Sequence, residues 1–223
     1  MILQANNLRK NFIHNGTSLE ILKSITVSFN QGNSYAITGV SGSGKSTLIH
    51  ILSGTDLPTD GQIYFNTDDI NKFNQKQKEN FLSKDIGLVF QEPYLIKELT
   101  VLENVIIKGL INCSNVSDVR SKGMDFLEQI GLGHKADQLP ATLSIGQQQR
   151  VAILRALFNK PKFLLADEPT ANLDEKTGKD ITKLLNQFKN EFSTGIITVT
   201  HDKYLADSCE QTLNLENGNL LIV

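Results

Sequence analysis

The segment GVSGSGKST, residues 39–47, constrains the fold more than any other part of the chain. Its first eight residues fit the pattern G-x-x-x-x-G-K-[ST], in which glycines let the backbone curl so that successive N–H groups point toward a bound anion. A short apolar strand is expected before it at Tyr35–Thr38, and the apolar spacing of Lys45–Leu52 predicts a helix after it. This order predicts a phosphate-binding loop in an α/β fold, whereas a flexible turn is the less favoured interpretation.

The loop predicts the chemistry of its ligand. The positive end of the following helix adds to the field of the backbone N–H groups, so the segment is suited to a polyphosphate. We expect Lys45 to place its charge on the β- and γ-phosphates and Ser46 to offer its hydroxyl to Mg²⁺. The residues expected to contact the nucleotide phosphates are Gly39, Val40, Ser41, Gly42, Ser43, Gly44, Lys45, Ser46 and Thr47.

Two carboxylates follow a second apolar segment, KFLLADEPT at residues 162–170. A carboxylate at the carboxyl end of a strand lies in the crevice where α/β sheets bind ligands. Asp167 is therefore placed to hold Mg²⁺ through its water shell, and Glu168 to polarise a water for attack on the γ-phosphate. Acids at strand ends are common, so a solvated strand end is the alternative interpretation.

The segment LSIGQQQR, residues 143–150, predicts another helix start. Ser144 would cap the helix and Gln147 would complete a capping box, with Gly146 between them. A local cap explains these residues by itself. The same helix terminus is also suited to a second anion.

The remaining pattern predicts an α/β core interrupted by helices. Strands are expected at Leu3–Leu8, Ile21–Phe29 and Ile63–Phe65, and strand and helix alternate again from Ser144 to the end. Between them, residues 100–132 have helical spacing. Thr100 with Glu103 forms a predicted capping box for the first helix there, Ser117 is the expected cap of the second, and hinges are expected near Gln91 and Ser144.

The bulk properties exclude several classes of protein. The net charge of -2, with no basic block, disfavours a nucleic-acid partner. The amino terminus has no secretion signal, and no apolar run approaches the ~20 residues that span a bilayer, so we expect a chain that is soluble when alone. Cys113 and Cys209 lie far apart without metal-type spacing and are expected to be reduced thiols.

Six motifs in a fixed order give the chain a family resemblance. They are GVSGSGKST, the Gln91 of IGLVFQ, LSIGQQQR, FLLADEPT, ANLD at residues 171–174, and TVTHD at residues 198–202. In this order they resemble the ATP-binding subunit of an ABC (ATP-binding cassette) transporter, over nearly the whole length of the chain. The resemblance implies an ATP hydrolase whose cofactors are ATP and Mg²⁺.

The resemblance also implies an architecture. We expect an α/β fold with a RecA-like P-loop NTPase core, a mostly parallel sheet, an antiparallel β subdomain near the amino terminus and an inserted helical subdomain. The whole chain, residues 1–223, would be one ABC ATPase domain. Residues 1–91 and 144–223 would form the nucleotide-binding core, and residues 92–143 the helical subdomain.

Site roles follow from the matching motifs. Cassettes of this family pair head to tail around two ATPs, so the partner of this chain is a second copy of itself. The resemblance implies that Glu168 is the general base, that His201 contacts the γ-phosphate, and that Gln91 touches Mg²⁺ and the attacking water. Phe12 resembles the aromatic that stacks on adenine, with a core phenylalanine as the alternative. The residues implied to act on the other subunit's ATP are Ser144, Ile145, Gly146, Gln147 and Asp174.

One residue departs from the family pattern. The usual motif is L-S-G-G-Q, and Ile145 replaces its first glycine. A β-branched residue resists positive φ, but as the first residue of a helix capped by Ser144 its φ is acceptable. The remaining cost is steric, so we hypothesise slower ATP-driven closure than in a two-glycine cassette.

The resemblance further indicates a branch and a location. The segments ELTVLENV and LADEPTANLD resemble the bacterial branch of lipoprotein-release, cell-division and macrolide-export cassettes. The implied partner is a separate membrane-spanning subunit, received by the surface around Tyr94–Leu99, with core residues of the helical subdomain as the equal alternative for Tyr94, Leu95 and Ile96. The implied location is the cytoplasmic face of the inner membrane. Two alternatives remain, a soluble non-transport ABC ATPase and an unrelated P-loop enzyme such as a small-molecule kinase.

Overall fold

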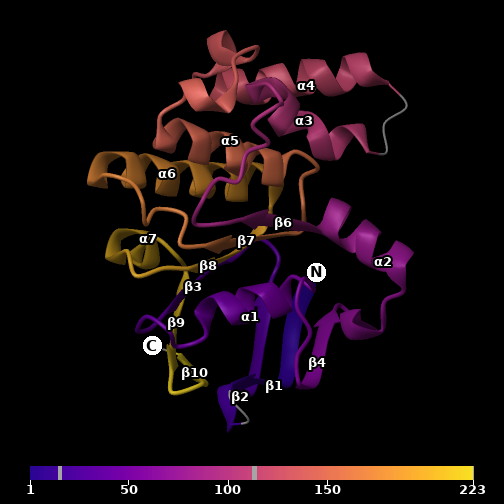
Figure 1. Ribbon diagram of the computed structural model, residues 1–223, viewed down its shortest axis with the longest axis vertical. Coiled ribbons are helices and arrows are strands. Elements are labelled where there is room, and N and C mark those ends of the chain that lie inside the picture. The colour runs from indigo at the N-terminus through magenta and orange to yellow at the C-terminus, as the bar shows by residue number, and fades with distance from the viewer. Residues whose placement is uncertain (15–16, 112–114, 223) are drawn as a thin grey trace.

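The computed structural model describes residues 1–14, 17–111 and 115–222, and its strands form two sheets (Figure 1). The first sheet is antiparallel, with the order β2-β1-β4-β5. Its strands are β1 (Ile2–His14), β2 (Thr17–Asn30), β4 (Asp60–Phe65) and the short β5 (Asp68–Asp69). This sheet confirms the antiparallel β unit expected near the amino terminus.

The second sheet has six strands in the order β10-β9-β3-β8-β7-β6. All neighbours in it are parallel except β10, which is antiparallel to β9. Its strands are β3 (Ser34–Thr38), β6 (Ile86–Val89), β7 (Phe163–Asp167), β8 (Gly195–Val199), β9 (Gln211–Glu216) and β10 (Asn219–Ile222). The central strands are apolar runs buried on both faces, which is typical of parallel strands covered by helices.

Helices lie on both faces of the second sheet (Figure 1). Helix α1 (Lys45–Leu52) lies between the two sheets, and its apolar residues share one core with both of them. Helices α5 (Ile145–Leu157) and α6 (Glu175–Phe192) cover the other face and share a second core with α3 (Val101–Leu110) and α4 (Val116–Gln129). The short elements are α2 (Gln75–Asn80), α7 (Lys203–Asp207), a π-helical turn (Phe81–Asp85) and 3-10 turns at Ile70–Lys72, Gly133–Lys135 and Pro140–Thr142.

Helix caps test the sequence predictions directly. Both predicted capping boxes are confirmed, since the hydroxyls of Thr100 and Ser144 accept from the N–H groups of Glu103 and Gln147. The predicted cap at Ser117 is wrong, because helix α4 starts earlier and the Asn115 side chain accepts from the Ser117 N–H. Asparagine and serine are nearly equal as caps, so the sequence alone did not separate these two positions.

Other boundaries differ from expectation. Strands β1 and β2 are longer than the apolar runs within them, because their polar ends remain paired as a hairpin with register shifts between Ala5 and Asn11. Helix α2 and the π-helical turn after it were not anticipated, since QKQKEN carries no apolar periodicity and no residue of α2 is buried. The α/β fold class is confirmed, while the division of the chain at residues 91 and 144 stays a prediction.

Two further expectations concern the state of the cysteine thiols and the absence of a membrane-spanning segment. Burial raises the pKa of the Cys209 thiol to about 11, so it is an unreactive group, while Cys113 lies outside the described residues. Within the described ranges, no helix is long and apolar enough to pass through a bilayer.

Candidate functional site

The glycine segment connects the buried strand β3 to helix α1. Gly42 and Gly44 have φ values of 79° and 99°, and Gly44 directly precedes the helix in a left-handed conformation. A Cβ at Gly44 would lie 2.6 Å from Cγ2 of Ile21, so the loop passes directly against β2. The sequence pattern therefore corresponds to a tight curl that side chains larger than glycine would disrupt.

Lys45 lies inside this curl. Its side chain is buried, and its ammonium donates to the Gly39 carbonyl at 2.9 Å and the Val40 carbonyl at 3.0 Å. A cation surrounded by backbone groups at the start of a helix is the arrangement that binds polyphosphates.

A pocket of about 630 Å³ opens above the loop. It brings together predicted site residues from five separate parts of the chain. They are Phe12, Gly39, Ser41, Gly42, Gly44, Lys45, Ser46, Thr47, Gln91, Glu168 and His201. Val40, Ser43 and Asp167 do not contribute to this lining, whereas Ile21, Ala171 and Val199 do and were not anticipated. Ala171 and Val199 lie in the ANLD and TVTHD motifs but were given no site role, and Ile21 is an apolar neighbour in space that no motif marks.

Asp167 and Glu168 stand at the carboxyl end of β7, as predicted. The Oδ1 atom of Asp167 is buried and meets no hydrogen-bond partner among the residues that the structure describes. A buried carboxylate oxygen in this state requires a cation or water beside it. The Ser46 hydroxyl and the Gln91 amide line the pocket, and Asp167 directly precedes the lining residue Glu168. Together these oxygen donors fit Mg²⁺, which prefers oxygen ligands and keeps several waters or phosphate oxygens.

Glu168 and His201 form the closest polar pair of the site. The Oε2 atom of Glu168 lies 2.8 Å from Nδ1 of His201 and accepts the His201 backbone N–H at 3.2 Å. The Glu168 side chain is only 15% exposed, and its φ of 48° is a strained value for a residue other than glycine. Parallel pairing of β7 with β8 aligns Asp167 with Val199 and so brings the following residues of both strands together. The pair is placed to hold and polarise a water at the pocket.

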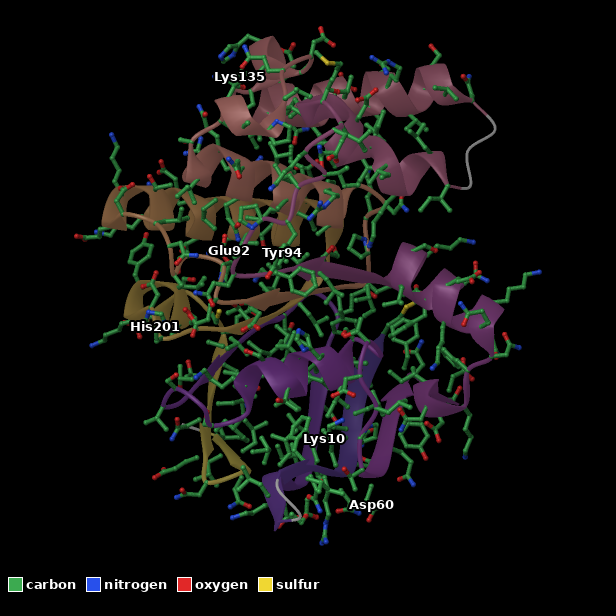
Figure 2. The ribbon with its side chains drawn as sticks, viewed as in Figure 1. Lys10, Asp60, Glu92, Tyr94, Lys135 and His201 are labelled. Carbon is green, nitrogen blue, oxygen red and sulfur yellow. The ribbon has the colours of Figure 1, made fainter. Side chains whose placement is uncertain are left out.

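The loop after Gln91 is held by side chains that the sequence did not single out. The buried Gln149 of α5 donates to the Phe90 carbonyl at 3.1 Å. Arg155 of the same helix donates to the carbonyls of Pro93 at 2.8 Å and Tyr94 at 2.7 Å. Tyr94 itself has a φ of 42° and is 68% exposed. Helix α5 therefore fixes the loop that carries the exposed Tyr94 (labelled in Figure 2).

The four residues Ser144–Gln147 form a separate helix start. Of the described residues that line the main pocket, none comes from this segment. Ser144 and Ile145 are exposed, and Ile145 is the first residue of α5, as the sequence predicts. Gly146 is buried, and a Cβ there would lie 2.4 Å from Cγ2 of Thr177, so this glycine lets α5 approach α6 closely.

Asp174 has a local role that the sequence did not reveal. Its carboxylate caps α6 by accepting from the backbone N–H of Thr177 at 3.0 Å and from its hydroxyl at 2.6 Å. These hydrogen bonds from Thr177 lower the pKa of Asp174 although it is exposed. The preceding Asn172 donates to Glu92 at 2.9 Å, so the ANLD segment contacts the loop after Gln91.

Comparisons with known proteins agree with this geometry. Residues 22–171 match the family model described as ABC transporter. The chain is 41% identical over 221 residues to the lipoprotein-releasing system ATP-binding protein LolD of Legionella pneumophila (strain Paris), covering 99% of this chain and 97% of that protein. It is 36% identical over 222 residues to LolD of Shewanella oneidensis, covering 100% and 96% of the two chains.

Solved structures give the same result. The dimeric ATP-binding cassette MJ0796 in a post-hydrolysis state with ADP and Pi superposes with a TM-score of 0.90 at 34% identity, covering 98% of this chain and 96% of that one. A second dimeric structure of that cassette matches equally well. These similarities remove the unrelated P-loop enzyme from consideration. The chain belongs to the ABC transporter family and is an ATP-hydrolysing subunit of such a transporter.

Proposed function

We propose that two copies of this chain close on two Mg²⁺-bound ATP molecules and that this closure drives a separate membrane subunit in releasing lipoproteins. One observation carries the first part. A pocket lies at the phosphate loop, and the start of α5 at Ser144–Gln147, where Ser144 and Ile145 are exposed, lies outside that pocket and is also suited to an anion. Head-to-tail pairing gives this helix start a ligand, namely the γ-phosphate bound to the other copy.

Within one site the roles follow the residue chemistry. The phosphate loop and Lys45 hold the β- and γ-phosphates, and Phe12 stacks on the base. Ser46, Gln91 and Asp167 hold the Mg²⁺, which neutralises charge that develops on the phosphates. Glu168 accepts a proton from the attacking water, and His201 holds the Glu168 carboxylate through the 2.8 Å contact.

The partner copy completes the site. The helix start at Ser144, Ile145, Gly146 and Gln147 faces the γ-phosphate of the other copy's ATP, and Asp174 lies beside it across the interface. Because the γ-phosphate is bound from both sides, ATP favours the closed pair and hydrolysis removes the bridge.

The membrane part of the proposal rests on the relatives. Two proteins named as lipoprotein-releasing ATP-binding subunits match almost the whole chain. The exposed Tyr94 and the half-exposed Ile96 offer apolar surface to a membrane subunit, whereas Leu95 packs against the core. We propose that the chain lies peripherally at the cytoplasmic face of the inner membrane, bound through this loop.

Reconstitution tests the proposal. The chain is placed in liposomes with the membrane subunit that co-purifies with it, and a fluorescent lipoprotein is included. ATP should move the lipoprotein to a soluble acceptor, and the Glu168→Gln variant should not. Hydrolysis without any movement of the lipoprotein would contradict the assigned substrate while leaving the ATPase assignment intact.

A further inference from the structure

A lysine lies behind the aromatic ring that we assign to the base. The Nζ atom of Lys10 is 5.1 Å from the centre of the Phe12 ring, within the range of a cation–π contact. Both residues are on β1, two positions apart, and the ring contact joins their side chains across the register shift that follows Lys10. Phe12 is 45% exposed and lines the pocket above the phosphate loop, which leaves ring surface available on the pocket side.

The Lys10 ammonium is itself fixed in place. It lies 2.9 Å from Oδ1 and 2.8 Å from Oδ2 of Asp56 and donates to the Leu57 carbonyl at 2.6 Å. Its side chain is only 12% exposed. Figure 2 shows Lys10 beneath α1, on the side of the antiparallel sheet. The long side chain of this lysine is thus held by three acceptor atoms and is not a mobile surface group.

Asp56 connects this cluster to the phosphate loop. The backbone N–H groups of Thr55 and Asp56 both donate to the His50 carbonyl in the last turn of α1. The first residue of the same helix is Lys45, in the phosphate loop. One helix therefore carries the phosphate site at its start and, just after its end, the carboxylate that anchors Lys10.

We propose that Lys10 is a positioning residue for nucleotide binding. Its ammonium covers one face of the Phe12 ring, so that the opposite face receives the base. The inference rests on the proposed stacking role of Phe12. It gives a structural reason for the position of the ring relative to the phosphate loop, because Lys10 links β1 to Asp56, and Asp56 follows the helix that starts in this loop. Lys10 does not line the pocket above the phosphate loop, so its effect should fall on the base and not on the phosphates.

The test separates base binding from phosphate binding. Affinities of the isolated protein for ATP and for tripolyphosphate, both with Mg²⁺, are measured by calorimetry. Lys10→Met should lower the affinity for ATP about fivefold, which is about 1 kcal/mol, and should change the affinity for tripolyphosphate less than about twofold. Lys10→Arg should keep ATP affinity, because it retains the cation. Lys23→Met, at an exposed lysine of β2, is the matched control and should change neither affinity.

A double-mutant cycle then tests whether Lys10 acts through Phe12. When Phe12 is already alanine, adding Lys10→Met should lower the ATP affinity by less than about twofold. A full fivefold loss in that background, or an equal loss for ATP and tripolyphosphate, would overturn the inference. If Phe12→Ala leaves ATP affinity unchanged, the stacking role itself is wrong, and that result is distinct from a failure of Lys10 alone.

A spectroscopic readout covers the case in which Lys10→Met does not fold. The sequence contains no tryptophan, so Phe12→Trp places a single tryptophan at the proposed stacking position, and its emission can be excited selectively over that of the tyrosines. Stacking of adenine should quench its emission, and Asp56→Asn, which weakens the anchor of Lys10, should reduce that quenching at saturating ATP. Unchanged quenching in the Asp56→Asn variant would also overturn the inference.

Discussion

Glu168 combines two features that rarely occur by accident in one residue. Its backbone lies in the left-handed region, which costs about 1–3 kcal/mol for such residues, and its carboxylate contacts both the side chain and the backbone of His201. The strain is maintained because its N–H donates to the Val199 carbonyl and its own carbonyl accepts from Ala171. The carboxylate is therefore held in one orientation at the pocket, as a general base requires.

The Glu168→Gln variant tests this base. An amide has nearly the same shape but accepts no proton, so hydrolysis should fall about 100- to 10,000-fold while ATP affinity stays within about twofold. Phosphate release under saturating ATP and direct ATP binding measure the two effects. Glu191→Gln, at an exposed position near the end of α6, is the control and should hydrolyse normally. An unchanged hydrolysis rate in Glu168→Gln would remove Glu168 from this role.

Ile145 makes a second prediction at the residue scale. It occupies the first position of α5 and is 55% exposed, beside the proposed contact with the other copy's ATP. Replacing it with glycine should raise the ATPase rate of the complete complex several-fold, because about 1 kcal/mol in the closed state corresponds to about a fivefold rate. Ile145→Ala removes most of the side chain without the backbone freedom of glycine, so it should give part of the increase in ATPase rate. A rate that stays the same or falls in both variants would argue against the steric hypothesis.

At the scale of elements, the sequence predicts features that are encoded in contiguous motifs, but it does not predict contacts between distant residues. The phosphate loop, the capping boxes at Thr100 and Ser144 and the carboxylates at the end of β7 are encoded within a few residues each. The side chains of Gln149 and Arg155 reach loop carbonyls about sixty positions away in the sequence, so no local pattern reveals them. Packing of the whole fold, not local propensity, decides such contacts.

The same limit applies to individual assignments. Asp174 was expected only to lie at an interface between copies, and the structure adds its role as the cap of α6. Helix α2 was not predicted, because a helix without a buried residue has no apolar periodicity in its sequence. The roles of the site residues toward nucleotide remain predictions, and the experiments proposed here test them.

Helix α3 is joined to the π-helical turn Phe81–Asp85 by a lysine whose protonation should affect stability. Lys108 donates to the carbonyls of Leu82 at 3.0 Å and Ile86 at 3.1 Å. Burial, with a smaller contribution from the charge of Arg155, lowers the pKa of Lys108 to about 8. Between about pH 8 and the ordinary lysine pKa of 10.5, the unfolded chain keeps a proton that the folded chain has lost. The free energy of unfolding therefore rises with pH in this window.

The Lys108→Met variant isolates this contribution. The stability of the wild type relative to the variant should increase by about 2–3 kcal/mol between pH 7.5 and pH 10.5, as measured by denaturant unfolding. Lys76→Met, at an exposed position of α2, should show no such trend. A difference between the wild type and Lys108→Met that is constant with pH would show that Lys108 keeps its ordinary pKa in the folded protein.

At the scale of the whole molecule, the fold separates the two halves of the proposed ATP site. The pocket at the phosphate loop lies between β3, α1 and the ends of β7 and β8, whereas Ser144–Gln147 start a helix whose residues do not line it. This separation agrees with the proposal that each copy supplies its two helix starts to different nucleotides. The loop that presents Tyr94 is held by α5, the helix that begins at Ser144, so one rigid element connects the proposed membrane contact with the proposed interface.

The central claim is that ATP with Mg²⁺ joins two copies of the chain, and sedimentation of the Glu168→Gln protein tests it most directly. With ATP and Mg²⁺ the account predicts a dimer that contains two ATP molecules, and with ADP it predicts a monomer. Adding Lys45→Ala should abolish the dimer, because the phosphates lose their main cation. A Glu168→Gln protein that binds one ATP per chain and stays monomeric, alone and with its membrane partner, would contradict the account.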